Sequence, residues 1–400
     1  MEPDATAAER PTQPAASGRG VAAAFAFSFG LGAVLAPQAF AGALGWTLAA
    51  GFALVAAAGF ALIRSLSRAG RSSGPLFALW TLQALLVVPE LGLRSAGFEH
   101  LSGIQFGYPH PEDFWQLELD DELFWKLPAG SPMSNSLGFF GPEPARPKPR
   151  GVQRLVMLGD SCSQQDHPFA WPELAARELS TPERAWECVN LALSGYSSHQ
   201  GLKVAQRWLG ELEPDLVAIY FGWNDHWLAR GAIDSAKRPA LAFERVYRAS
   251  ALLQALRKLL VRAGLLGGDA PLMTQARVPL EEYRSNLVAM VALAREAGAR
   301  VVLITAPSTH DLAVPEYLLK HRFQTDARAV VEEHGRYNQA LRELAERQQA
   351  PLLDLERDFA ERDDRGALLR EDGIHFSEAG RIAAARAFAE FVREQGLVSR

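Results

Sequence analysis

The second part of the chain, from Val152 onward, is predicted to form an α/β fold with a parallel, three-layer sheet. Short apolar runs alternate there with longer amphipathic stretches, a pattern typical of strands that helices cover on both faces. Five such runs with helices between them favour a parallel sheet over an antiparallel meander. We expect strands at residues 155–158, 188–193, 216–221, 301–304 and 352–355, and helices at 171–179, 200–212, 280–297 and 327–348.

Polar sequences follow the first three expected strands, and one more lies near the end of the chain. Ligands of parallel α/β sheets bind beyond the carboxyl ends of the strands, so the first three should converge on one edge. Each motif alone could be a helix cap or a turn, but their joint order and placement favour a site. The four blocks are Gly159-Asp160-Ser161, an isolated Gly195, Gly222-Trp223-Asn224-Asp225 and Asp372-Gly373-Ile374-His375.

These blocks supply the groups that a serine enzyme needs for ester hydrolysis or acyl transfer. Ser161 is the expected nucleophile, His375 the base that takes its proton, and Asp372 the carboxylate that fixes the imidazole tautomer. The backbone N–H groups of Ser161 and Gly195, together with the Asn224 amide, are the expected oxyanion donors. Three neighbouring side chains are expected to support the site: Asp160, Asp225 and His226.

The N-terminal part of the chain is predicted to cross a membrane. Residues 21–63 contain no Asp, Glu, Lys or Arg, which is long enough for two helices with a turn around Pro37 to Gly42. A cleavable signal peptide is the alternative, but nothing ends the apolar run early enough. A third span is expected at residues 74–93, although Pro89 and Glu90 weaken it and an amphipathic or re-entrant segment is the alternative.

Arginines near these segments predict which side of the membrane each loop occupies. Arg64, Arg68 and Arg71 lie between the second and third segments, and Arg10 and Arg19 precede the first. The positive-inside rule places both stretches in the cytoplasm. Three spans would then put everything after residue 94 outside the cytoplasmic membrane, whereas two spans would leave it inside.

The domain organisation expected from these features has four parts. A cytoplasmic tail covers residues 1–20, a membrane region 21–94, a connecting segment 95–151 and the catalytic domain 152–400. The connecting segment is expected to hold a small hairpin, residues 114–119 and 123–127, followed by a proline-stiffened linker at 141–151. Within the catalytic domain, residues 225–277 form an insertion with an amphipathic helix at 251–263. That helix could be a lid, a partner surface, a membrane contact or an ordinary packed helix.

Composition excludes several other classes of function. The net charge of −5 and the absence of a long basic run argue against nucleic-acid binding.

The two cysteines, Cys162 and Cys188, are expected at opposite ends of their strands and therefore as two buried thiols. Trp223 and Trp227 could stack on a sugar ring or pack under the insertion. The remaining histidines lack the spacing of a metal site: His167, His199, His226, His310, His321 and His334.

From Val152 to the C-terminus the sequence resembles the SGNH, or GDSL-type, hydrolase superfamily. Ser161, Gly195, Asn224 and the Asp372/His375 pair match its four blocks, with Cys162 in place of the usual leucine. The resemblance implies a flavodoxin-like sheet, a Ser-His-Asp triad and no metal or other cofactor. Residues 135–139 (Asn-Ser-Leu-Gly-Phe) also resemble a segment of bacterial membrane-anchored members, although phenylalanine follows where arginine is expected.

The sequence as a whole therefore predicts a membrane-anchored serine esterase at the bacterial cytoplasmic membrane, with its catalytic domain outside. Its substrate would be an acyl ester, such as an acetylated glycan or a lipid of the envelope. One alternative is an O-acyltransferase that uses the same residues on a cell-envelope polysaccharide. Another is a non-catalytic glycan-binding protein on a hydrolase fold. The oligomeric state is not encoded in any pattern that we recognise.

Overall fold

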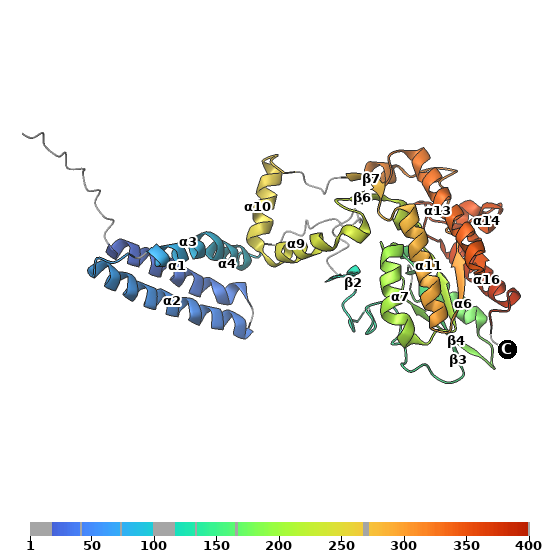
Figure 1. The fold of residues 1–400 in the computed structure, drawn as a ribbon, viewed down its shortest axis with the longest axis horizontal. Helices are drawn as coiled ribbons and strands as arrows, with labels where there is room; N and C mark the ends of the chain where they lie inside the picture. Colours follow the sequence, from blue (N-terminus) through green and yellow to red (C-terminus); the bar gives the residue numbers. More distant parts are fainter. Residues whose placement is uncertain are drawn as a thin grey trace, which may run out of the picture. The chain divides into compact units, whose positions relative to one another are not determined.

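The computed structural model describes residues 18–40, 42–72, 74–98, 117–132, 134–164, 167–266 and 272–398. The chain divides into two compact units, Met1–Ser102 with Val246–Leu266, and Gly103–Arg245 with Gly267–Arg400 (Figure 1). This division differs from the expected boundary at residue 151. The expected linker belongs to the same unit as the sheet, and part of the insertion belongs to the first unit.

The first unit contains three helices that are long and apolar enough to cross a membrane: Gly20–Ala39, Gly42–Arg68 and Gly74–Ser95. The first lies within α1 (Gly18–Ala39) and the second is α2 (Gly42–Arg68). Pro37 lies inside α1, and the break between α1, which ends at Ala39, and α2, which begins at Gly42, falls within the range expected for the turn. The third joins α3 (Gly74–Leu82), a π-helical turn (Gln83–Val87) and α4 (Val88–Ser95) into one helix that continues past Pro89.

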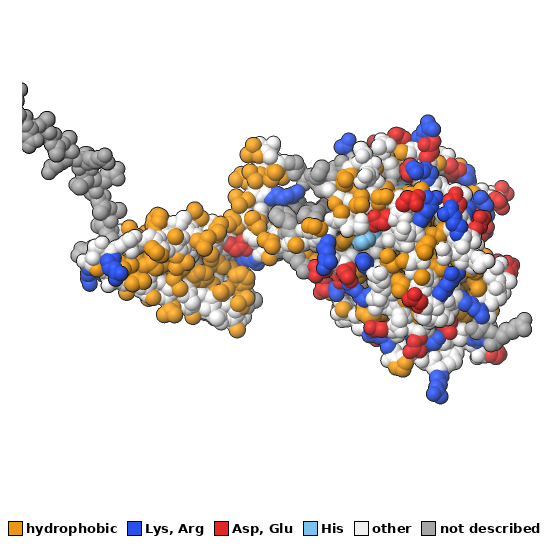
Figure 2. All heavy atoms as spheres, viewed as in Figure 1, with side chains coloured by type: hydrophobic (Ala, Val, Ile, Leu, Met, Phe, Trp, Pro, Cys, Tyr) orange, Lys and Arg blue, Asp and Glu red, His pale blue; other side chains and the backbone are white. Residues whose placement is uncertain are grey.

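The close packing of the apolar helices and the hydrophobic side chains on their outer surface both fit a lipid environment. The Phe25 ring lies against Gly59, where a Cβ would approach the ring to 2.1 Å, so only glycine lets α1 and α2 come this close. Inside the bundle, Gln83 Nε2 donates to the Ser28 carbonyl at 2.9 Å. Figure 2 shows hydrophobic side chains over the outside of these helices, among them the exposed Phe27 and Trp46. Lipid would solvate such a surface, whereas water would not.

The second unit is built on a parallel five-stranded sheet with strand order β4-β3-β5-β8-β9. In chain order this is 2-1-3-4-5, the flavodoxin-like arrangement, so the predicted fold class is confirmed. The direction in which the chain adds strands reverses between β3 and β5, which places the ligand crevice beyond the ends of these two strands. The bounds are β3 (Val152–Leu158), β4 (Ala185–Asn190), β5 (Leu216–Ile219), β8 (Arg300–Ile304) and β9 (Leu352–Leu353).

Helices cover both faces of the sheet, because its side chains alternate between two apolar cores. Val156 and Leu158 of β3 face one core, and Leu155 and Met157 face the other. The first core packs against α7 (Ser198–Leu212), α11 (Leu280–Glu296) and much of α13 (Ala327–Gln348), and the second against α6 (Trp171–Leu179) and α16 (Glu378–Glu394) (Figure 1).

Strand ends differ from the predicted ones where polar side chains intervene. β4 ends at Asn190 rather than at residue 193, because the Asn190 carboxamide accepts the Ala192 N–H and turns the chain. β9 is two residues long, and Leu355, predicted as strand, instead begins α14 (Leu355–Ala360). The shorter elements are α5 (Ser161–Gln164), α8 (Trp223–His226), α12 (Glu316–Lys320) and α15 (Arg365–Leu368).

The connecting region and the insertion add two small antiparallel pairs. β1 (Glu118–Asp120) and β2 (Phe124–Lys126) form the expected hairpin, although its residues 114–116 lie outside the described part of the chain. The insertion leaves the sheet through β6 (Leu228–Arg230) and returns through β7 (Leu272–Ala276), which pair with each other. Between them lie a 3₁₀ turn (Asp234–Ala236), α9 (Arg238–Ala249) and α10 (Ala251–Arg262), the expected amphipathic helix.

Candidate active site

The three residues expected to form a triad are joined by hydrogen bonds in the order that serine chemistry requires. His375 Nε2 lies 2.8 Å from Ser161 Oγ, and His375 Nδ1 lies 2.8 Å from Asp372 Oδ2. Ser161 is the first residue of α5, directly after β3, so a strand-to-helix turn presents its hydroxyl. The two ends of this arrangement are more than two hundred residues apart in sequence, and the fold brings them into contact.

A compact loop before α16 presents both Asp372 and His375. Asp372 Oδ1 accepts the backbone N–H groups of Ile374 and His375, each at 2.9 Å, and Gly373 has a φ of +71° that favours glycine. Burial opposes ionisation of Asp372, but the hydrogen bonds and charge of His375 outweigh it and lower the carboxyl pKa to about 2. The carboxylate is therefore charged at neutral pH and holds the imidazole in one orientation.

Asn224 lies at the end of the neighbouring strand, and Asp160 orients it. Asn224 Nδ2 donates to Asp160 Oδ2 at 3.4 Å, and Asp160 Oδ1 accepts the Cys162 N–H at 2.9 Å. Burial raises the pKa of Asp160 to about 6, although the Cys162 N–H, the His375 charge and Asn224 counteract it. Asp160 thus links the first and third blocks through these hydrogen bonds.

Gly195 follows β4 with a φ of +80°, and a buried ionic cluster holds its loop. Arg277 donates to the Gly195 carbonyl at 2.9 Å and pairs with Asp234 at 2.9 Å, and both charged side chains are fully buried. Lys237 pairs with the same carboxylate at 2.6 Å. Burial opposes the charge on Asp234, but Arg277 and Lys237 outweigh it, so its pKa lies well below the usual range. Because Arg277 donates to the Gly195 carbonyl, the loop around Gly195 is held in place.

Residues of the connecting region and of α5 fix the same loop from other sides. The Trp125 indole donates to the Ser194 carbonyl at 3.1 Å, and Tyr196 Oη donates to the Trp125 carbonyl at 2.8 Å. Ser194 Oγ donates to Gln164 Oε1 at 2.7 Å, which ties this loop to the helix that begins with Ser161. Phe139 of the Asn-Ser-Leu-Gly-Phe segment packs edge-on against Tyr196. The connecting segment is therefore part of the support of the site.

Asp225 is buried behind the site and connects two blocks. Its Oδ1 accepts the Ser198 N–H at 2.9 Å at the start of α7, and its backbone carbonyl accepts the Val278 N–H at 3.0 Å. Burial raises the pKa of Asp225 to about 7, against the hydrogen bonds of Ser198 and the charge of Arg277. Its place indicates a structural role next to the expected oxyanion amide.

His226 belongs to a buried aromatic cluster around Trp223. The Trp223 ring stacks on His334 at 3.7 Å between centroids and on Trp227 at 5.8 Å, so these indoles pack within the protein and present no open face for a sugar. Burial lowers the pKa of His226, and that of His334 to about 3, so both imidazoles are neutral at neutral pH. A third histidine, His310, packs edge-on against the same indole.

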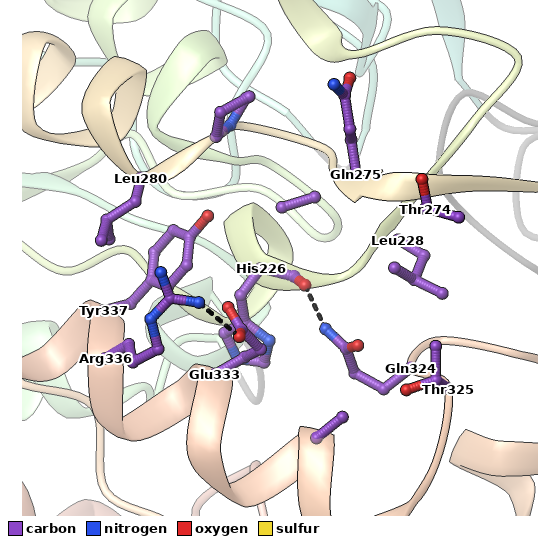
Figure 3. A pocket seen from close by; sticks show the side chains of 13 residues that line it. His226, Leu228, Thr274, Gln275, Leu280, Gln324, Thr325, Glu333, Arg336 and Tyr337 are labelled. Atoms are coloured by element: carbon purple, nitrogen blue, oxygen red, sulfur yellow. Dashed lines mark hydrogen bonds and ion pairs between the residues drawn. The ribbon is translucent and has the colours of Figure 1, made fainter.

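His226 also lines a pocket of about 390 Å³ between β7, α13 and the loop before α13 (Figure 3). Polar side chains surround it, including the Arg336–Glu333 ion pair at 2.6 Å. Ser161, Asn224 and His375 do not line this pocket. His226, two residues after Asn224, therefore also lines a cavity that these three residues do not line.

A family model for GDSL-like lipases and acylhydrolases matches residues 157–381, more than half of the chain. The chain belongs to this family. This acylhydrolase is accordingly an ester-hydrolysing enzyme with the fold described above. No curated protein matches the chain.

Solved structures of similar proteins each cover about three fifths of the acylhydrolase. A lipase/acylhydrolase from Enterococcus faecalis is 18% identical with a TM-score of 0.41, covering 61% of this chain and 96% of its own. An acetyl xylan esterase is 15% identical with a TM-score of 0.39, covering 60% and 99%. A GDSL-like lipase from Bacteroides thetaiotaomicron is 15% identical with a TM-score of 0.37, covering 60% and 89%.

Several residues around the acylhydrolase site were not foreseen from the sequence. Arg277 and Asp234 lie in the insertion, and no motif marks them as partners of the Gly195 loop. His310 was counted among scattered histidines, yet its Nε2 donates to the Asp372 carbonyl at 2.8 Å. Both cysteines are free thiols, with Cys162 buried and Cys188 only partly so.

Proposed function

We propose that the protein is a membrane-anchored serine esterase that hydrolyses an acyl ester through Ser161, His375 and Asp372. The observation that carries this proposal is the continuous hydrogen-bonded chain from Ser161 Oγ through the imidazole to the Asp372 carboxylate, with both links at 2.8 Å. A nucleophile, its base and the group that orients the base are the minimum for covalent acyl transfer.

The geometry supports the following sequence of steps. Ser161 Oγ attacks the ester carbonyl carbon while its proton passes to His375 Nε2. The tetrahedral intermediate then collapses, the alkoxide leaving group takes that proton, and the acyl group stays on Ser161. A water molecule, deprotonated by the same imidazole, attacks the acyl carbon and releases the carboxylic acid, and the proton returns to Ser161.

The oxyanion of each intermediate would be stabilised by the backbone N–H groups of Ser161 and Gly195 and by Asn224 Nδ2. Asp160 supports this role for Asn224, because a buried acceptor on one side fixes the direction of the remaining amide N–H. The buried Arg277 supports the role of Gly195 by holding its carbonyl, which leaves the peptide with little freedom to rotate. Donors that are fixed before the reaction cost no reorganisation during it.

The catalytic unit is proposed to lie outside the cytoplasmic membrane of a bacterium. Three apolar helices and the arginines that flank the first two support this orientation. Reporter fusions after Arg94 test it. An alkaline phosphatase fusion should be active and a green fluorescent protein fusion dark, and the opposite pair of results would place the catalytic unit in the cytoplasm.

Covalent labelling tests the catalytic proposal directly. A fluorophosphonate should label the purified full-length chain, and Ser161→Ala should abolish the label together with hydrolysis of p-nitrophenyl acetate. Ser163→Ala is the matched control. Its hydroxyl is buried and has no hydrogen-bond partner among the described residues, so its removal should leave both signals in place. Labelling that persists in Ser161→Ala would refute the assignment.

The acceptor of the acyl group distinguishes hydrolysis from transfer, since the same residues serve both. Incubation with an activated acetyl ester, with and without a polysaccharide acceptor, should release acetate at the same rate in both samples if water is the acceptor. Acetylated polysaccharide at the expense of free acetate would establish the O-acyltransferase instead. A folded protein that neither labels nor turns over would establish the non-catalytic, glycan-binding alternative.

A further inference from the structure

The amphipathic helix α10 has an apolar face that its own unit leaves uncovered. Four of its five leucines, at positions 253, 256, 259 and 260, lie on one side at helical spacing, and Leu256 and Leu259 are 45% and 63% exposed. Its charged residues are all basic: Arg257, Lys258 and Arg262. Leu265 and Leu266, directly after the helix, are exposed as well. Water alone is a poor environment for such a surface.

The start of α10 is fastened to the C-terminal end of the third apolar helix. The Glu90 carboxylate accepts the N–H groups of Ala251 and Leu252, at 2.9 and 2.7 Å, and the Ser250 hydroxyl at 2.9 Å. An acidic group at a helix N-terminus satisfies orphan donors and complements the helix dipole. Arg94 pairs with Glu90 at 2.7 Å, which fixes the carboxylate in turn. Glu90 thus connects α4 to the N-terminus of α10.

The direction of α10 matters because the apolar helices define the direction of a membrane crossing. Figure 1 shows α10 standing crosswise at the end of α4 and not alongside it. A helix that lies across a span, at its end, runs along the membrane surface. An apolar groove of about 570 Å³ lies where α10 meets the spans, with Phe52, Leu86 and Leu253 among its lining residues. The groove and the leucine face share Leu253, so they form one apolar surface.

We propose that α10 is an interfacial helix whose leucine face is seated in the leaflet at the C-terminal end of the third span, with lipid acyl chains as the occupant of that face. Lys258 and Arg262 lie on the opposite side and face the headgroups, Arg257 borders the leucine face, and the three positive charges together favour an anionic leaflet. Bilayer lipid is the occupant because the same unit carries three helices that fit a bilayer and because Glu90 holds α10 at the end of one of them. The helix thereby gives the insertion a second attachment to the membrane.

Site-specific fluorescence on the full-length protein in nanodiscs tests this placement. Leu256→Cys carries an environment-sensitive dye on the leucine face, and Lys258→Cys carries it on the basic face as the matched control. Both are made in a Cys188→Ala background, and the parent without a new cysteine controls for labelling of buried Cys162. Hydrolysis of a water-soluble ester, which neither position touches, verifies that each labelled protein is folded.

The expected result is a blue-shifted emission at position 256 that lipids with a quencher near the headgroup suppress several-fold more than at position 258. Replacing anionic phosphatidylglycerol with phosphatidylcholine should weaken that quenching. Equal, water-like emission at both positions would overturn the proposal. So would an apolar signal at 256 that no lipid quencher reaches, because protein, from this chain or from a second copy, would then cover the face.

Discussion

Replacing Asp372 with asparagine tests the triad with little disturbance to the fold. The carboxylate has two tasks: Oδ1 accepts the N–H groups of Ile374 and His375, and Oδ2 receives His375 Nδ1–H at 2.8 Å. Asparagine keeps the first task, because its carbonyl oxygen can take the place of Oδ1. Its amide then presents an N–H to His375 Nδ1, which favours the tautomer with the proton on Nε2. That nitrogen can no longer accept the Ser161 proton.

The expected loss follows from this tautomer change. A wrong tautomer in a serine triad lowers kcat by roughly 10³- to 10⁴-fold, equivalent to about 4 to 5 kcal/mol of transition-state stabilisation. KM for p-nitrophenyl acetate should change far less, since Asp372 contacts the imidazole and not the ester. Urea unfolding should give a free energy within about 1 kcal/mol of the parent, because the loop keeps its backbone hydrogen bonds.

Steady-state kinetics on the purified full-length chain measure the effect, with the number of active sites fixed by fluorophosphonate titration. Glu371→Gln is the matched control, because this neighbouring carboxylate is exposed and should leave kcat unchanged. An Asp372→Asn enzyme that retains kcat within about tenfold of the parent would refute the role of Asp372 as the group that orients His375.

Three further substitutions test the surroundings of the triad. Asn224→Ala should lower kcat by about 10²- to 10³-fold with a smaller change in KM, since it removes one proposed oxyanion donor; an unchanged kcat would exclude that donor. Asp225→Asn should flatten the pH dependence of unfolding between pH 4 and 7: a folded pKa of about 7, above the unfolded value of 3.8, makes stability fall as pH rises, and asparagine cannot ionise. Parallel pH profiles of mutant and parent would contradict this. Arg277→Leu should cost about 3 to 5 kcal/mol in urea unfolding by leaving buried Asp234 with one cation fewer, whereas Arg328→Leu, at an exposed ion pair, should leave the unfolding midpoint nearly unchanged.

The sheet and its helices could be predicted from the sequence because apolar periodicity records burial. The expected bounds of α6 and α13, residues 171–179 and 327–348, agree with the structure to the residue. Strand ends were less accurate, since they depend on single side-chain contacts. Asn190 stops β4 by bonding to Ala192, although the apolar run continues through Leu193. Periodicity does not register an effect of that kind.

The sequence predicted the residues of the candidate site, but not the residues that hold the loop around Gly195 in place. Three blocks that follow strands, with a fourth near the end of the chain, predicted which residues would lie together, because strand ends meet at one edge of a parallel sheet. Arg277 and Asp234 could not be identified in that way. They are distant in sequence from Gly195, and their pairing depends on how a long insertion folds back. The connecting segment was assigned to a separate part of the chain for a similar reason, as nothing in its sequence shows that Trp125 bonds next to Gly195.

The way in which the insertion is fastened explains how it can belong to both units. Its two ends are fixed at the site: β6 pairs with β7, Arg277 holds Gly195, and Val278 bonds to Asp225. With both ends clamped, the chain between them can leave the catalytic unit without moving the oxyanion donors. Residues from Val246 then join the first unit through Glu90. The buried ion cluster of Asp234, Lys237 and Arg277 therefore fixes the ends of the insertion next to Gly195, while residues between those ends belong to the other unit.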